Sequence, residues 1–170
     1  MKPYHISGEY DCRDPLTYDR MILFFEKTFS VHKDVLNRVK HLAEKIRNGI
    51  ERLDPFIQQA NQSVCPRCKE VCCISKHGYY KYEDLIYLFA LGLKPPHMIF
   101  GRNDSDPCQF LIKTGCSMER WQRPSGCNWY FCDSLLDYME PQPAYRDFDE
   151  TLSNVAELWI EMVEEFRRIS

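Results

Sequence analysis

Glycine is scarce in this sequence, with seven glycines among 170 residues, and no glycine-rich phosphate-binding loop occurs. Long apolar runs are also missing, since no stretch approaches the ~18 apolar residues that a membrane helix needs. Acidic and basic residues nearly balance, 25 against 22, for a formal charge of −3. That balance excludes a general electrostatic attraction to nucleic acid or anionic lipid. We therefore expect neither a nucleic-acid partner nor a membrane.

The first twenty residues contain charges throughout and have no signal-peptide core or small-residue cleavage site. We therefore expect a cytoplasmic location, where a cysteine cluster indicates a metal or redox site before a disulfide framework. No internal repeat or low-complexity linker is visible. A length of 170 residues with 44% hydrophobic content suits a single soluble domain over 1–170.

Apolar periodicity predicts a mainly α fold with helices near 15–29, 31–53, 82–91 and 148–168. Asp14-Pro15 is a typical helix start, and Gly92 is placed to end the third helix. Asp54-Pro55 is expected to bend or restart the second helix. The second helix has an apolar stripe of Val35, Leu36, Val39, Leu42, Ala43, Ile46, Ile50 and Leu53, and the fourth one of Leu152, Val155, Ala156, Trp159, Val163 and Phe166.

The middle of the chain lacks such periodicity. Between Lys94 and Arg146 prolines recur, and we interpret the segment as loops organised by something other than regular secondary structure. The predicted organisation is a helical part at about 14–62, a cysteine-cluster part at about 63–132 and a C-terminal helix at about 148–168. The helices would pack around an irregular, metal-organised and cysteine-rich middle.

Cysteine is the residue that this chain has in excess, with nine in total and eight of them between positions 65 and 132. The stretch CPRCKEVCC carries a two-residue spacing that lets both thiolates of a turn face one ion. Its adjacent pair can serve one metal centre from two sides or bridge to two centres. The candidate metal ligands are Cys65, Cys68, Cys72, Cys73, Cys108, Cys116, Cys127 and Cys132.

Other interpretations of the cysteines remain open. A disulfide scaffold or unrelated buried thiols would also use cysteine, but polar neighbours such as Lys69 and Arg123 argue against simple burial. Cys12 has no near neighbour and is interpreted as a small core residue. Cys132 is either an added ligand or a thiol beside the site. Because the adjacent pair cannot readily converge on one ion with the first two cysteines, we predict that Cys108, Cys116 or Cys127 shares a centre with the first group.

The order of these motifs resembles a bacterial cysteine-cluster family described as zinc- or iron-chelating, whose signature is CxxCxxCC, then CxFL, then CxIYxxRPxxC. CPRCKEVCC is similar to the first block, and YYKYEDLIYLFALGL to the helix that follows it. The later blocks are matched by Cys108, Phe110 and Leu111, and by Cys116, Arg123, Pro124 and Cys127. The resemblance covers about residues 63–132. Three residues instead of two separate Cys68 from Cys72, and the interval from Cys116 to Cys127 is one residue longer than usual.

The resemblance implies a metal-binding protein that chelates zinc or iron through thiolates, with a structural, storage or sensing role and a metal ion as its partner. Thiolate ligands suit zinc and iron–sulfur clusters alike, and eight cysteines could make two four-cysteine sites, a cluster plus a zinc site, or one shared binuclear site. A more distant similarity to flagellin lysine methylases gives the alternative of an iron–sulfur-dependent enzyme, redox or protein-modifying. Whether the chain catalyses a reaction, and whether it has a protein partner, is left open.

Residues beside the cysteines have simpler expected roles. Arg123 is expected to donate hydrogen bonds to thiolates or nearby carbonyls. His77 is interpreted as a surface or loop histidine. Four aromatic residues flank the cysteines and are expected to exclude water from the centre: Trp121, Trp129, Tyr130 and Phe131. Four glutamates on the last helix are interpreted as its solvated face: Glu157, Glu161, Glu164 and Glu165.

Overall fold

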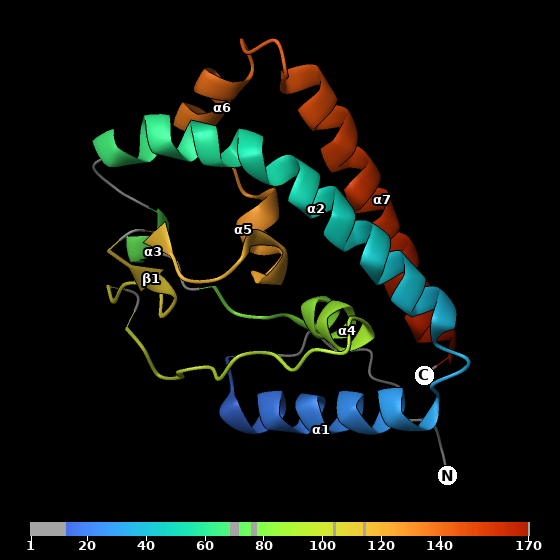
Figure 1. Ribbon diagram of the computed structural model, residues 1–170. Coiled ribbons are helices and arrows are strands. Elements are labelled where there is room, and N and C mark those ends of the chain that lie inside the picture. The colour runs from blue at the N-terminus through green and yellow to red at the C-terminus, as the bar shows by residue number, and fades with distance from the viewer. Residues whose placement is uncertain (1–12, 69–71, 76–77, 104, 114, 170) are drawn as a thin grey trace.

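The computed structural model describes residues 13–68, 72–75, 78–103, 105–113 and 115–169, without the side chains of residues 74 and 75. The chain is mainly helical, as the sequence predicts. Its four longest helices are α1 (Pro15–Val31), α2 (Asn37–Val64), α4 (Tyr82–Ala90) and α7 (Tyr145–Ile169) (Figure 1). The shorter elements are helices α3 (Cys72–Ser75), α5 (Gly126–Trp129) and α6 (Asp133–Met139), 3-10 turns η1 (Cys65–Arg67) and η2 (Arg120–Gln122), and strands β1 (Leu111–Ile112) and β2 (Gly115–Cys116).

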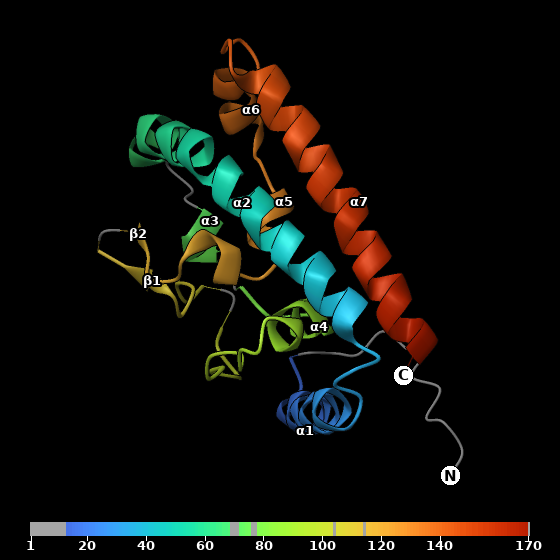
Figure 2. The same cartoon turned by 45° about the vertical axis from the view of Figure 1, so that its right-hand side comes forward.

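The long helices α2 and α7 lie side by side and run antiparallel (Figure 1 and Figure 2). They approach closely at Gly49, where a Cβ atom would overlap Cγ2 of Val155. Further along the pair, the rings of Phe56 and Phe148 pack with centroids 4.9 Å apart. Glycine at position 49 therefore sets the distance between the two helices.

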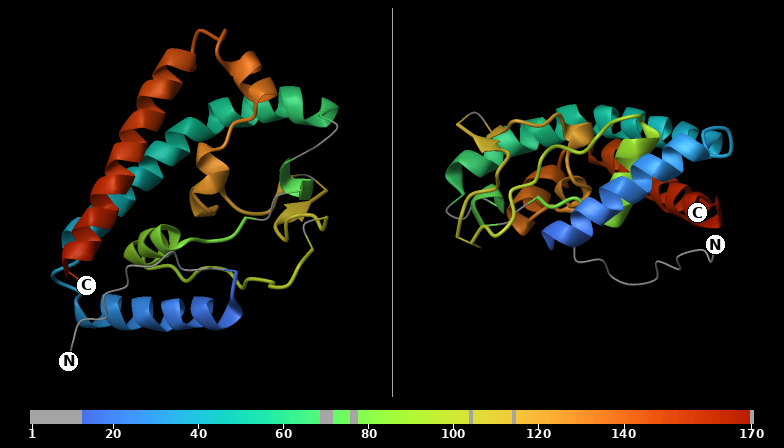
Figure 3. Two further views of the ribbon diagram at one scale, coloured as in Figure 1. Left: turned by 180° about the vertical axis from the view of Figure 1, so that it is seen from behind. Right: turned by 90° about the horizontal axis from the view of Figure 1, so that it is seen from below.

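An aromatic cluster joins α1 and α4 to the end of α7. Phe25 of α1 is fully buried, and its ring centroid lies 5.7 Å from that of Phe89 and 5.6 Å from that of Phe166. Phe29 stacks on Phe166 as well, with centroids 5.6 Å apart. Helix α4 consequently lies between α1 and the α2–α7 pair (Figure 3). Burial of these large rings supplies much of the apolar stabilisation at this end of the molecule.

The start and end of the predicted helices follow their local signals. Asp14 caps α1, because its Oδ2 accepts a hydrogen bond from the Thr17 N–H at 2.7 Å. Gly92 has a φ of +73°, which favours glycine, and the next N–H, of Leu93, donates to the Leu88 carbonyl at 2.9 Å. Gly92 therefore ends α4 as expected. Within the described residues, no helix combines the length and apolar character needed to cross a membrane.

The second predicted helix was placed wrongly at both of its ends. Val31 ends α1, α2 begins only at Asn37, and Val35 is 59% exposed instead of lining the core. At the other end α2 continues through Pro55 as far as Val64, so the proline does not restart the helix. The direction of α2 changes along its length, which agrees with a bend (Figure 1).

The segment between Lys94 and Arg146 was predicted as loops, and this is wrong for its last part. Helix α6 forms there, with Leu135 and Met139 buried one turn apart. A helix of two turns supplies too few apolar residues for a period to be recognised. Helix α3 and the β1–β2 hairpin lie on the side of α2 away from α7 (Figure 2), whereas α5 reaches α7, since Trp129 packs on Trp159. The cysteine-rich segment thus packs against the α2–α7 pair.

Candidate metal centre

Four cysteines gather where α2 ends, and we call Cys65, Cys68, Cys72 and Cys132 the first set. Cys65 is the residue that caps the C-terminal end of α2, and the Cys68 N–H donates to the Cys65 carbonyl at 3.1 Å across η1. Cys132 caps the N-terminal end of α6. Burial raises the pKa of the Cys65 thiol, and the charges of its three companions raise it further. The four sulfurs are therefore close enough to interact electrostatically.

The other four cysteines make a second set, Cys73, Cys108, Cys116 and Cys127. The Cys108 N–H donates to the Cys73 carbonyl at 2.7 Å and so joins the two cysteine blocks of the sequence directly. The β1–β2 hairpin pairs Leu111 with Cys116 and brings Cys116 back toward Cys108. Cys127 enters from the first turn of α5. Contact between the two blocks is required for the shared centre that the sequence predicts, and the shared centre itself stays a prediction.

The thiols of the second set also influence one another. Burial raises the pKa of Cys73, followed by the charges of Cys108 and Cys116 and only then by that of its neighbour Cys72. Burial, Cys108, Cys116 and Cys73 together raise the pKa of Cys127 to about 12. The Cys127 residue is exposed as a whole, but its sulfur is desolvated by the protein atoms around it. Metal binding at these thiols must therefore displace protons.

Gly78 gives a second, steric indication that the second set is assembled. A Cβ atom built on Gly78 would lie 3.6 Å from Sγ of Cys127 and 3.8 Å from Sγ of Cys108. The same atom would lie 3.4 Å from Cγ of Pro124. One glycine therefore faces two sulfurs that are far apart in the sequence.

Arg123 is the cation that acts electrostatically on the second set. Its charge lowers the pKa of Cys73 and of Cys127, against the effects of burial and of the other thiols. Its Nε donates a hydrogen bond to the Met118 carbonyl at 2.9 Å, so the predicted contact with a carbonyl is present. Held in this way, the guanidinium would offset part of the charge of several thiolates.

Asp84 is a residue that the sequence analysis missed. Its carboxylate is buried at the start of α4, where Oδ2 accepts from the Lys81 N–H at 2.8 Å and Oδ1 from the Ser125 N–H at 3.0 Å. Burial raises the pKa of Asp84, while these hydrogen bonds lower it. Ser125 lies two residues before Cys127, so Asp84 fixes the loop that presents this thiol. The sequence signal that could have identified Asp84 is its position as an acidic residue in the first turn of a predicted helix.

The aromatic residues near the cysteines attach this segment to the helices. The guanidinium of Arg47 on α2 lies 4.1 Å from the ring centroid of Trp121. Trp129 packs edge-on against Trp159 of α7, with centroids 5.8 Å apart. Phe131 packs against Phe148 in the same way at 5.6 Å, whereas Tyr130 is 48% exposed. These contacts dock the segment onto α2 and α7, and a role in shielding a centre stays a prediction.

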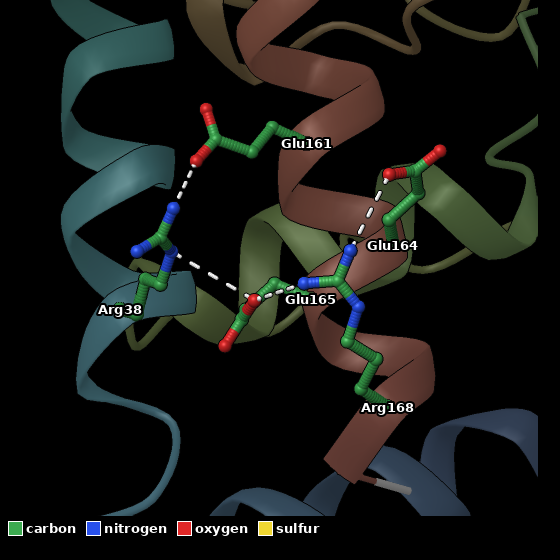
Figure 4. A network of polar contacts seen from close by, with 5 residues as sticks. All are labelled: Arg38, Glu161, Glu164, Glu165 and Arg168. Carbon is green, nitrogen blue, oxygen red and sulfur yellow. Dashed lines mark hydrogen bonds and ion pairs between the residues drawn. The ribbon is translucent and has the colours of Figure 1, made fainter.

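The acidic face of α7 carries ion pairs instead of a metal site. Arg38 of α2 pairs with Glu161 and Glu165, and Arg168 pairs with Glu164 and Glu165 (Figure 4). Glu157 is exposed on the same helix. The interpretation as a solvated face holds for Glu157, Glu161 and Glu164, whereas the Glu165 side chain is only 19% exposed between two arginines. Of the histidines, His32, His41 and His97 are exposed, while His5, His77 and Cys12 lie outside the described residues.

All eight clustered cysteines are free thiols. Among the described residues, no three histidine, cysteine, aspartate or glutamate side chains are grouped tightly enough to hold a metal ion as they stand. The two sets are thus neighbourhoods whose sulfurs would have to close around an ion, since zinc is bound by sulfur at about 2.3 Å. The metal-organised character of the middle segment therefore belongs to the proposed function and not to the fold.

Comparisons with protein-family models, with curated proteins and with solved structures each gave no match for this chain. The resemblance to the cysteine-cluster family consequently rests on the quoted motifs alone.

Proposed function

We propose that this protein binds zinc or iron through the thiolates of its two cysteine sets, in a structural, storage or sensing role. The observation that carries the proposal is the contact between free cysteines from separate segments: the Cys108 N–H donates to the Cys73 carbonyl, and Gly78 faces the sulfurs of Cys108 and Cys127. Neighbouring thiols that raise one another's pKa are unfavourable as thiolates unless a cation offsets their charge. A bound metal ion is the cation that would do so most strongly.

The chemistry of the donors fits the two metals. Thiolates are soft ligands, and sets of four thiolates are typical of zinc and of iron–sulfur centres. Zinc bound in this way would supply folding free energy to a segment whose only described strands are two residues long each. The motifs that resemble the cysteine-cluster family also support chelation of zinc or iron.

An iron–sulfur-dependent enzyme, redox or protein-modifying, remains the alternative function. It rests on ligand type and on the distant similarity to flagellin lysine methylases, and no contact in the described residues favours it over chelation alone. Iron–sulfur clusters absorb visible light and lose intensity on reduction, so the two proposals can be separated by spectroscopy.

Elemental analysis of the purified full chain, combined with thiol titration, tests the proposal. We expect bound zinc or iron and clustered thiols that react only after a chelator has removed the metal. Cys12→Ser is the matched control and should leave the metal content unchanged, because Cys12 is not among the proposed ligands. Metal-free protein with freely reactive thiols would show that the proposal is wrong. Visible absorption that bleaches on reduction would favour the iron–sulfur alternative.

A further inference from the structure

The adjacent residues Cys72 and Cys73 raise the question of how many centres the cysteines form. Both lie in helix α3, where successive residues point about 100° apart around the axis. Two side chains that diverge in this way cannot readily bind one ion together with Cys65 and Cys68. Each of them must find its other ligands in a different direction.

The contacts of Cys73 lead toward the later cysteines. Its carbonyl accepts the Cys108 N–H at 2.7 Å, and Gly78 faces the sulfurs of both Cys108 and Cys127. The hairpin turn returns the chain to Cys116, since the Leu111 N–H donates to the Cys108 carbonyl at 2.9 Å and Leu111 pairs with Cys116. The second set is therefore connected by backbone contacts as well as by its sulfurs.

The first set lies between two helix ends. Cys65 caps α2 and Cys132 caps α6. Helix α6 packs on α2, and the Ser63 hydroxyl, two residues before Cys65, donates to the Tyr138 hydroxyl of α6 at 3.1 Å. A cysteine outside the family signature thus supplies the first set with its fourth sulfur.

We propose that the protein forms two separate four-thiolate centres, one from the first set and one from the second, with Cys72 and Cys73 serving different centres. This inference rests on the proposed function and adds the number and composition of the sites. The first centre would join the end of α2 to the start of α6. The second would hold the hairpin and the start of α5 to α3, with Arg123 as its neighbouring cation. Loss of the first metal should therefore loosen α6, and loss of the second should loosen the hairpin.

Cobalt titration of the chelator-treated full chain, under anaerobic and reducing conditions, tests the inference. Thiolate-to-cobalt charge-transfer absorption and native mass spectrometry count the bound ions, and a competing chelator masks weak binding. We expect two tight equivalents in the unaltered chain. Cys72→Ser and Cys73→Ser are neighbours and matched controls for each other, and each should weaken one of the two equivalents by at least tenfold.

Double variants separate two centres from one shared centre. Cys72→Ser with Cys132→Ser alters one set and should leave one tight equivalent. Cys73→Ser with Cys132→Ser alters both sets and should leave none. Loss of both equivalents in the first double variant, or retention of one in the second, would overturn the inference while leaving metal binding intact. An unaltered chain that binds no metal would instead refute the proposed function.

A thiol footprint gives an independent measurement on the loaded single variants. Alkylation followed by peptide mass spectrometry should show lost protection only at the companions of the replaced cysteine. In Cys72→Ser the newly reactive thiols should be Cys65, Cys68 and Cys132, and in Cys73→Ser they should be Cys108, Cys116 and Cys127. Identical footprints in the two variants would contradict the division into two centres.

Discussion

Replacing Asp84 with alanine is expected to destabilise the protein strongly and to weaken its second set of cysteines. The carboxylate accepts two backbone N–H groups, from Lys81 at 2.8 Å and from Ser125 at 3.0 Å, in a buried position. Ser125 is buried, and a buried N–H left without an acceptor costs about 1–3 kcal/mol. Lys81 is exposed, so loss of its acceptor costs about as much as loss of a helix cap, ~0.5–2 kcal/mol. Removal of a buried carboxyl group relieves part of this cost, so we expect a net loss of about 2–4 kcal/mol in the free energy of unfolding.

Denaturant unfolding of the full chain, with metal buffered at a constant free concentration, measures this loss. In a thermal scan of the same protein, the unfolding midpoint should fall by about 4–16 °C for a domain of this size. Glu83→Ala is the matched control, because the neighbouring Glu83 makes only a 3.6 Å ion pair with Arg167 at the surface. That substitution should cost about 0–1 kcal/mol. Equal effects of the two substitutions would refute the role assigned to Asp84.

The pH dependence of stability gives the same residue a second test. Burial raises the pKa of Asp84 in the folded protein, so the folded state binds more protons than the unfolded state between the ordinary carboxyl pKa and the raised one. The contribution of Asp84 to stability therefore falls as pH rises through this window and is constant above it. Asp84→Asn cannot titrate and should lack this decline. If the free energy of unfolding of the unaltered protein instead rises with pH relative to that of Asp84→Asn, the assigned pKa shift is wrong.

Three further substitutions test the packing of the helices and of the site. Gly49→Ala should lower the free energy of unfolding by about 1–3 kcal/mol through overlap with Val155, although alanine favours helices by about 1 kcal/mol. This loss should disappear in a Val155→Ala background. Asp54→Ala leaves the buried guanidinium of Arg120 unpaired and should cost about 3 kcal/mol in denaturant unfolding, more than loss of an exposed ion pair. Gly78→Val should weaken metal binding at the second set alone in a cobalt titration. Gly78→Ala should be tolerated, because its Cβ atom would make ordinary contacts of 3.4–3.8 Å. Equal effects of the two substitutions would contradict the assembly of that set.

The helices could be predicted where their signals are local. The cap at Asp14 and the stop at Gly92 each depend on residues within one turn of the helix end. The final helix was also predicted, because its buried residues recur over about five turns and include Trp159 and Phe166. Repetition of this kind is visible in a sequence whatever the rest of the fold does.

The errors arose where tertiary packing decided the outcome. Val35 and Leu36 both looked like members of one apolar stripe, yet Leu36 is fully buried and Val35 is 59% exposed. The difference depends on the turn between α1 and α2, which brings only one of the two side chains into the core. Asp84 received no role from its place in the sequence, and only the approach of the Ser125 loop makes it a buried acceptor.

Sequence spacing likewise does not tell which cysteines lie together in space. Spacing identifies Cys65 and Cys68 as neighbours, since a turn of three residues joins them. It also places Cys72 and Cys73 together, although successive residues of α3 point about 100° apart around the helix axis. The sequence left Cys132 undecided because its position depends on α6, which was predicted as loop. In the folded chain the charge of Cys132 raises the pKa of Cys65, so the grouping of these two cysteines depends on how α6 packs and not on the motif that resembles a metal site.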